Sequence, residues 1–217
     1  MTFKKNKYQV IKNALSFELA DFIFYYFLIK RDAVDFLYKK KMHPQTSTLG
    51  GWEDPQVPNT YICYGDFAME TLLIKMLPIM QQQINLDLVP TNSFARVYKK
   101  GDELKRHKDR PSCEISATIN LGGNPWPIFI EPSGERGKEG IKVLLEVGDM
   151  LAYRGCELEH WREPFEEDIC GQVFLHYNDL NGPFADKNKF DGRAMLGLPS
   201  NRTKKTPTTE EDSIKNK

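Results

Sequence analysis

Three residues of this sequence have the types and the spacing to bind one metal ion: His107, Asp109 and His160. His107 and Asp109 are two positions apart, so in an extended segment both side chains point to the same face. His160 follows Asp109 by 51 positions (160 minus 109), enough chain to return along a neighbouring strand. Two imidazoles and one carboxylate suit iron(II) and leave coordination positions open for other reactants. The spacing therefore predicts a metal site; the alternative is a surface ion pair and a buried histidine.

Short β-rich segments, which must position these three side chains, begin at about residue 91. They are separated by Gly, Pro, Asn or charged turns, a spacing typical of a β-sandwich or barrel. The segments are 93–100, 113–121, 126–132, 141–147, 150–155 and 170–179.

The N-terminal half has helical patterns instead. Ser16 is a good N-cap for a first helix, a second pattern covers 34–41, and a third covers 66–88, where we expect Pro78 to kink or divide the helix. Residues 43–65 are rich in Pro, Gly and Thr and are predicted to form a long loop, whose part 43–60 is either a lid or a simple connection.

The length of the chain suits a single domain, and we expect that domain to have three parts. Residues 1–90 form a helical support region, 91–183 the β core, and 184–217 a C-terminal extension. The last part of that extension is polar without apolar periodicity, so we expect it to be disordered.

Composition limits the partners. Thirty basic residues balance thirty acidic ones, so no overall field attracts nucleic acid or a membrane. The basic residues around 99–110 lack interleaved aromatics, which makes nucleic acid an unlikely partner; they either steer an anionic ligand or form a solvated hairpin. The N-terminus lacks the apolar run of a secretory signal, and we expect a cytoplasmic protein without a membrane partner.

Four segments of the chain resemble the iron(II)/2-oxoglutarate-dependent dioxygenases, most closely their prolyl 4-hydroxylase-like branch. They are RVYKKGDELKRHKD (96–109), ISATINLGG (115–123), VGDMLAYRG (147–155) and HWREPF (160–165). The resemblance implies an α+β, mainly β fold: a double-stranded β-helix (jelly roll) with N-terminal helices packed on one sheet.

The same resemblance implies an enzyme that binds Fe(II) through His107, Asp109 and His160. Such a hydroxylase is a dioxygenase that uses O2 and 2-oxoglutarate as cosubstrate, with ascorbate as a possible reductant. It decarboxylates 2-oxoglutarate to succinate and hydroxylates a carbon-hydrogen bond. The substrate is a peptide or protein, with a prolyl residue as one candidate, or a small molecule.

The residues that bind 2-oxoglutarate are less defined. The family places an Arg or Lys about ten residues beyond the last His to pair with the distal carboxylate, and that position here is Cys170. The candidates that remain are Arg162 and Arg96 as cations, Tyr98 as the family tyrosine, and Gln172 as a neutral donor.

Two further residues are candidates for substrate contact. They are Arg110, next to the predicted metal ligand, and Trp52 in the long loop, which could equally pin that loop to the body of the protein. Two other functions stay open. One is a cupin-like metal-binding protein without oxygenase activity, and the other is a non-catalytic β-sandwich used as a binding module.

Overall fold

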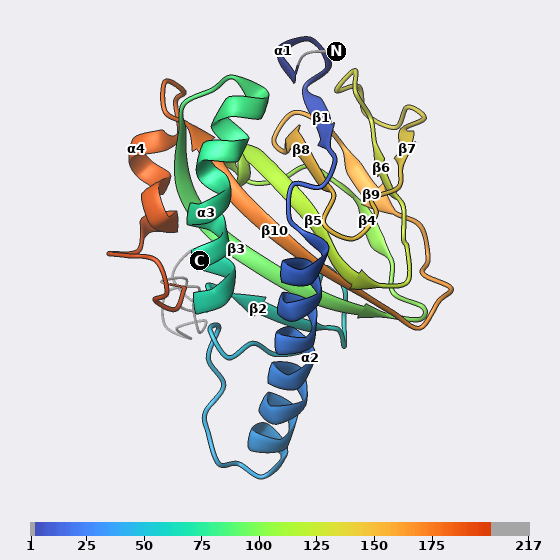
Figure 1. Ribbon diagram of the computed structural model, residues 1–217, viewed down its shortest axis with the longest axis vertical. Helices are drawn as coiled ribbons and strands as arrows, with labels where there is room; N and C mark the ends of the chain where they lie inside the picture. Colours follow the sequence, from blue (N-terminus) through green and yellow to red (C-terminus); the bar gives the residue numbers. More distant parts are fainter. Residues whose placement is uncertain (1–2, 201–217) are drawn as a thin grey trace, which may run out of the picture.

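The computed structural model describes residues 3–200, which form two antiparallel β-sheets with helices on the outer face of the larger sheet (Figure 1). The larger sheet contains β1 (Tyr8–Ile11), β8 (Met150–Arg154), β5 (Ile115–Gly123), β10 (Ile169–Asp179), β3 (Leu88–Lys99) and β2 (Tyr61–Tyr64), in this order. The smaller sheet contains β4 (Leu104–His107), β9 (His160–Arg162), β6 (Ile128–Ile130) and β7 (Ile141–Val143). The predicted disorder at the end of the chain lies outside the described residues.

The chain crosses between the two sheets repeatedly after β4. It enters the larger sheet at β5, forms the β6–β7 hairpin in the smaller sheet, and then visits β8, β9 and β10 in alternate sheets. This arrangement is the predicted double-stranded β-helix. β1 and β2 come from the N-terminal region and extend the larger sheet, so the support region and the β core share one sheet.

Two long helices cover the larger sheet. α2 (Phe17–Lys39) begins at Ser16, whose side chain accepts a hydrogen bond from the backbone of Leu19. The two helical patterns predicted before residue 42 form this one helix, because no Gly or Pro separates them. α3 (Phe67–Ile84) continues through Pro78, so Pro78 does not divide the helix as one of the two expectations had it. Pro78 and Ile74 are both exposed, on the side of the helix away from the core.

The main core lies between these helices and the larger sheet. Its buried side chains include Ile23, Phe24, Phe27, Leu73, Met76 and Met80 from the helices and Ala117, Ile119, Val173 and Leu175 from the sheet. Two glycines let α2 approach the sheet closely, because a Cβ at Gly122 or Gly171 would lie 2.8 or 2.5 Å from the ring of Phe24. The helices thus hold β5 and β10, the strands behind the candidate site.

The C-terminal part of the described chain contains α4 (Ala185–Asn188) and is attached by a buried ion pair. Arg193 Nη2 lies 2.6 Å from Glu70 Oε1 on α3, and the two residues are 4% and 3% exposed. The other oxygen of Glu70 accepts a hydrogen bond from the backbone of Gly197. One carboxylate therefore joins α3 to the segment that follows α4. Among the described residues, no helix is both long and apolar enough to cross a membrane.

Candidate metal centre

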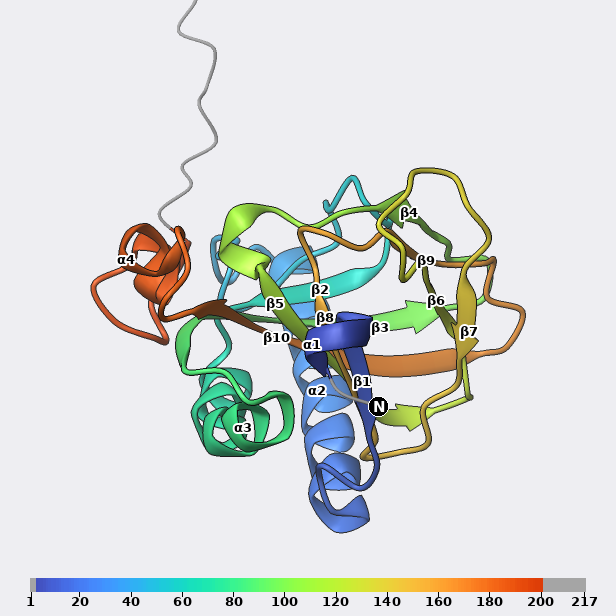
Figure 2. The same cartoon turned by 90° about the horizontal axis from the view of Figure 1, so that it is seen from above.

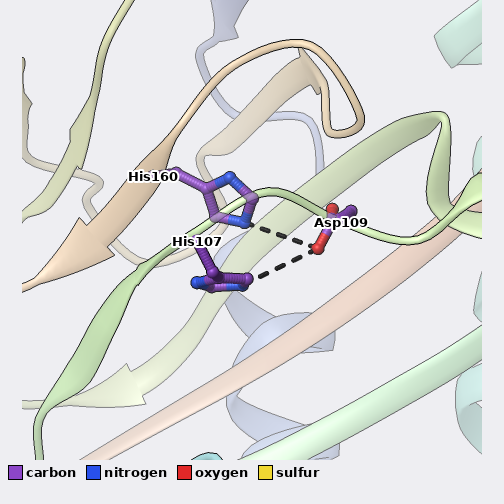
Figure 3. A group of neighbouring side chains, drawn as sticks. All are labelled: His107, Asp109 and His160. Carbon is purple, nitrogen blue, oxygen red and sulfur yellow. Dashed lines mark ion pairs between the residues drawn. The ribbon is translucent and has the colours of Figure 1, made fainter. Parts of the chain in front are cut away.

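His107, Asp109 and His160 meet between the two sheets, as Figure 3 shows. β4 and β9 are antiparallel neighbours that pair His107 directly with His160, so the ring centroids lie 4.2 Å apart. Asp109 follows the end of β4, and its Oδ1 lies 3.7 Å from His107 Nε2 and 3.5 Å from His160 Nε2. One ligand atom of each residue lies within 4.8 Å of the others. The structure brings the three predicted ligands together.

Backbone carbonyls orient both imidazoles. His107 Nδ1 lies 2.8 Å from the carbonyl oxygen of Lys105, and His160 Nδ1 lies 3.1 Å from that of Leu158. Because a carbonyl only accepts, each Nδ1 carries a proton, and the Nε2 of each ring is the nitrogen that lies toward Asp109. Burial lowers the pKa of His107, and the neighbouring His160 lowers it further, which also favours the neutral ring. Neutral imidazoles with free Nε2 lone pairs are the form that binds a metal.

Hydrogen bonds also fix the Asp109 carboxylate. Ser116 Oγ donates to Oδ2 over 2.7 Å, and the backbone N–H of Asp109 donates to the carbonyl of Gly155 over 2.9 Å. Burial would raise the pKa of Asp109, but the attraction of His160 and the bond from Ser116 outweigh it and hold the pKa well below its usual range. Any Cβ at Gly155 would collide with this carboxylate. The carboxylate is therefore ionised and held in place.

His176 supports this carboxylate through Ser116, a role that the sequence analysis missed. Its Nδ1 lies 3.0 Å from Ser116 Oγ, and burial lowers its pKa to about 4, so the ring is neutral. The alternation of β10 was the available signal, because Cys170, Gln172 and His176 share one face of that strand.

A cavity of about 460 Å³ opens beside the three ligands. Tyr98, Ile128, Tyr153 and Phe174 contribute aromatic and apolar surface to its lining, and polar and charged side chains such as Gln56, Lys108 and Asp191 contribute the rest. A concave, mostly apolar site with a few convergent polar groups is the common form of a small-molecule site.

Three buried polar side chains at or near this cavity have atoms without a hydrogen-bond partner within residues 3–200: Tyr98, Arg96 at its Nε, and Arg162. Tyr98 and Arg96 line the cavity, whereas Arg162 lies outside its lining. Tyr98 and Arg162 are 0% and 1% exposed, and within residues 3–200 the Tyr98 hydroxyl and the Nε and Nη2 of Arg162 have no hydrogen-bond partner. Arg162 Nη1 donates to the carbonyl of Trp126, and the guanidinium lies 5.0 Å from the Trp126 ring centroid. Burial raises the pKa of Tyr98 and the charges of Arg96 and Arg162 oppose the rise, which places both cations near the hydroxyl.

Arg96 is also buried, but it has an anionic partner. It forms an ion pair with Asp54 of the long loop, and its Nη2 lies 3.3 Å from Gln56 Oε1. Gln56 Nε2 in turn lies 3.0 Å from His107 Nε2. Both loop residues line the cavity, and the sequence analysis identified neither of them. The segment 43–60 thus reaches His107, one of the three predicted ligands.

The remaining candidates have other contacts. Gln172 is buried, accepts a hydrogen bond from Thr118 and donates to Cys170 Sγ over 3.2 Å. Arg110 lines the cavity, but its two terminal nitrogens lie 2.6 and 2.7 Å from the two carboxylate oxygens of Asp191.

Trp52 is not one of the described residues that line the cavity. Its ring lies 4.9 Å from that of Tyr61 and 6.5 Å from that of Tyr38, both centroid to centroid. These contacts fit the alternative in which Trp52 pins the long loop to the body of the protein.

Comparisons with known proteins establish the fold. No protein-family model and no curated protein sequence matches the chain. A prolyl-4-hydroxylase from Pseudomonas putida is 13% identical with a TM-score of 0.53, and the match covers 80% of this chain and 94% of that one. A prolyl hydroxylase from Trichoplax adhaerens, in complex with a peptide fragment of hypoxia inducible factor, is 16% identical with a TM-score of 0.55, over 86% of this chain and 87% of that one.

HygX from Streptomyces hygroscopicus has nickel, 2-oxoglutarate and hygromycin B bound in its structure. It is 13% identical to this chain with a TM-score of 0.54, and the match covers 84% of this chain and 86% of HygX. These likenesses confirm the predicted double-stranded β-helix with helices on one sheet.

Proposed function

We propose that this chain, which has the double-stranded β-helix fold of the iron(II)/2-oxoglutarate oxygenases, is a dioxygenase of that kind that hydroxylates a carbon-hydrogen bond. One observation carries the proposal: His107, Asp109 and His160 line one cavity with the buried hydroxyl of Tyr98, which has no hydrogen-bond partner within residues 3–200. A two-histidine, one-carboxylate set suits iron(II) and leaves positions open.

The donor set fits the metal. His107 Nε2, His160 Nε2 and the Asp109 carboxylate would hold the iron, since these atoms lie together, each imidazole donates from Nδ1 to a backbone carbonyl, and the carboxylate is ionised. When bound, iron would supply the redox chemistry by which dioxygen converts 2-oxoglutarate to succinate and carbon dioxide and hydroxylates the substrate. The protein contributes ligand orientation through the carbonyls behind each imidazole and through Ser116 behind the carboxylate.

Arg162 is the proposed anchor for the distal carboxylate of 2-oxoglutarate. Its Nε and Nη2 are both buried without partners within residues 3–200. Arg96 lacks a partner only at Nε and forms an ion pair with Asp54 through Nη2, and Gln172 uses both ends of its amide. A carboxylate at Arg162 would satisfy both nitrogens with charge-assisted bonds, and Tyr98 could donate a third. Cys170 lies near the Arg162 charge, so the cation comes from β9 instead of the family position on β10.

The substrate class is the finer part of the proposal. The Trichoplax adhaerens structure contains a peptide fragment and the HygX structure contains hygromycin B, so this fold accepts both peptide and small-molecule ligands. A cavity of about 460 Å³ has room for one amino-acid side chain or a small ring beside the metal ligands. A peptidyl substrate, with prolyl as the first residue to test, is therefore proposed from the resemblance.

Anaerobic titration tests the proposed function. Adding iron(II) and then 2-oxoglutarate to purified protein should produce the weak visible charge-transfer band of the chelated complex. Iron binding without a band at any cosubstrate concentration would contradict the proposal and favour a metal-binding protein without oxygenase activity. Absence of iron binding would favour a non-catalytic β-sandwich.

Replacing Arg162 by leucine should weaken 2-oxoglutarate binding about 100-fold, or about 2.7 kcal/mol, and leave iron affinity unchanged. The fold should tolerate the change, because an apolar side chain in place of a buried, incompletely paired cation is often neutral or stabilising. The band titration measures 2-oxoglutarate affinity, and a metal titration without cosubstrate measures iron affinity. An Arg96→Leu variant is the matched control; a loss confined to that variant would assign the anchor to Arg96 instead.

A further inference from the structure

The outward face of α2 carries an apolar stripe. Phe22, Tyr25, Ile29 and Phe36 are 69%, 57%, 69% and 55% exposed. Together with three charged residues, Glu18, Asp32 and Lys39, these four residues occupy positions 18, 22, 25, 29, 32, 36 and 39. The steps between them alternate between four and three residues, an average of 3.5, which is the period of a coiled-coil seam. The opposite face of α2, with Ile23 and Phe27, packs on the larger sheet. Figures 1 and 2 show the helix standing on the outside of the molecule.

We propose that this stripe binds a second copy of the chain, with the two α2 helices antiparallel about a two-fold axis at Ile29. Two aromatic members of the stripe are symmetric about this residue, because Phe22 lies seven positions before it and Phe36 seven positions after it. Tyr25, four positions before it, faces Ala33 of the partner subunit in this arrangement. The axis therefore places Ile29 against Ile29 of the partner subunit and Phe22 against Phe36 of the partner subunit. A two-fold interface requires such self-complementarity, since the same patch serves both subunits.

Two charges, one in the first turn of α2 and one on the residue that follows its last turn, specify the antiparallel direction. Glu18 lies 11 positions before Ile29 and Lys40 lies 11 positions after it, and both are exposed. An antiparallel pair brings Glu18 next to Lys40 of the partner subunit at each end of the seam. A parallel pair would bring like charges together at both ends, which is destabilising. The same symmetry that matches the apolar residues therefore also matches the charges.

The size of the stripe indicates a reversible dimer. A helix of 23 residues is about 35 Å long at 1.5 Å per residue. A fully buried aromatic side chain removes about 150–250 Å² of surface from water. Burying the exposed parts of the three aromatic residues and of Ile29 therefore removes roughly 500 Å² per subunit. The total of about 1,000 Å² is at the lower limit for specific interfaces, so we expect dissociation in the micromolar range.

Sedimentation velocity of the full chain from about 1 to 100 µM tests the dimer. The wild type should shift from monomer to dimer with concentration. Ile29→Asp should raise the dissociation constant about 100-fold, or about 2.7 kcal/mol, because it places two carboxylates at the axis. Ile29 is 69% exposed, so the fold should tolerate the change, which circular dichroism checks. Leu180→Asp, at a residue that is 53% exposed outside α2, is the matched control and should dimerise normally.

Charge reversal tests the direction of pairing. Glu18→Lys and Lys40→Glu should each weaken the dimer, and the double variant should restore it, because the opposite charges then meet again. A wild type that stays monomeric at 100 µM would overturn the proposal, and so would a dimer insensitive to Ile29→Asp. Two weakened single variants without recovery in the double variant would overturn the antiparallel arrangement.

Discussion

Alanine in place of Asp109 should reduce kcat/KM for succinate formation about 1,000-fold, or about 4 kcal/mol. Asp109 is the anionic member of the three-residue cluster, and its oxygens lie between both imidazoles and Ser116. Without it, two neutral ligands would have to balance the charge of the metal in a largely buried position. We therefore expect iron affinity and the charge-transfer band to be lost together, which anaerobic titration and succinate assays measure.

Two variants accompany this measurement. Asp109→Asn keeps the shape of the side chain and removes its charge, and it should behave like the alanine variant. Asp168→Ala removes a carboxylate that is exposed before β10 and should leave both readouts unchanged. Iron affinity within threefold of wild type in Asp109→Ala would show that this carboxylate is not a ligand.

Alanine in place of Glu70 should lower the free energy of unfolding by about 3–5 kcal/mol. The change leaves the Arg193 guanidinium buried without its anionic partner and removes the acceptor for the backbone of Gly197. Urea denaturation followed by circular dichroism gives the free energy.

The exposed pair between Asp35 and Lys39 is the matched control, and Asp35→Ala should change stability by less than about 1 kcal/mol. A double variant with methionine at both Glu70 and Arg193 should be less destabilised than the sum of the single changes, because no unpaired charge remains. A loss below about 1 kcal/mol for Glu70→Ala would contradict the buried-pair interpretation.

The sequence indicated the β core and the clustering of the three predicted ligands, and the family resemblance supplied the double-stranded β-helix topology. It did not indicate β2 (Tyr61–Tyr64), which lies within the predicted long loop 43–65, or β4 and β9 as strands. His107 and Asp109 are close in sequence, and the short β-rich runs indicated that His160 returns on a neighbouring strand, as the β4–β9 pairing has it. The strand alternation and the turn residues carry this information, because they depend on local backbone geometry.

The rest of the site depends on contacts that leave no periodic signal. Asp54 meets Arg96 across 42 residues and Gln56 meets His107 across 51, from a loop without regular structure. Asp191 meets Arg110 across 81 residues through a short turn. Each such contact depends on how a loop folds back over the sheets, and a single sequence does not define that path.

β9 carries both a proposed metal ligand and the proposed carboxylate anchor, at positions 160 and 162. Their separation is therefore set by covalent backbone geometry within one three-residue strand. A cation at position 170 would instead stand on a different strand, in the other sheet. The distance between these two positions therefore does not depend on how the two sheets pack. The contacts from Tyr98 on β3 and Ser116 on β5 come from the larger sheet and do depend on it.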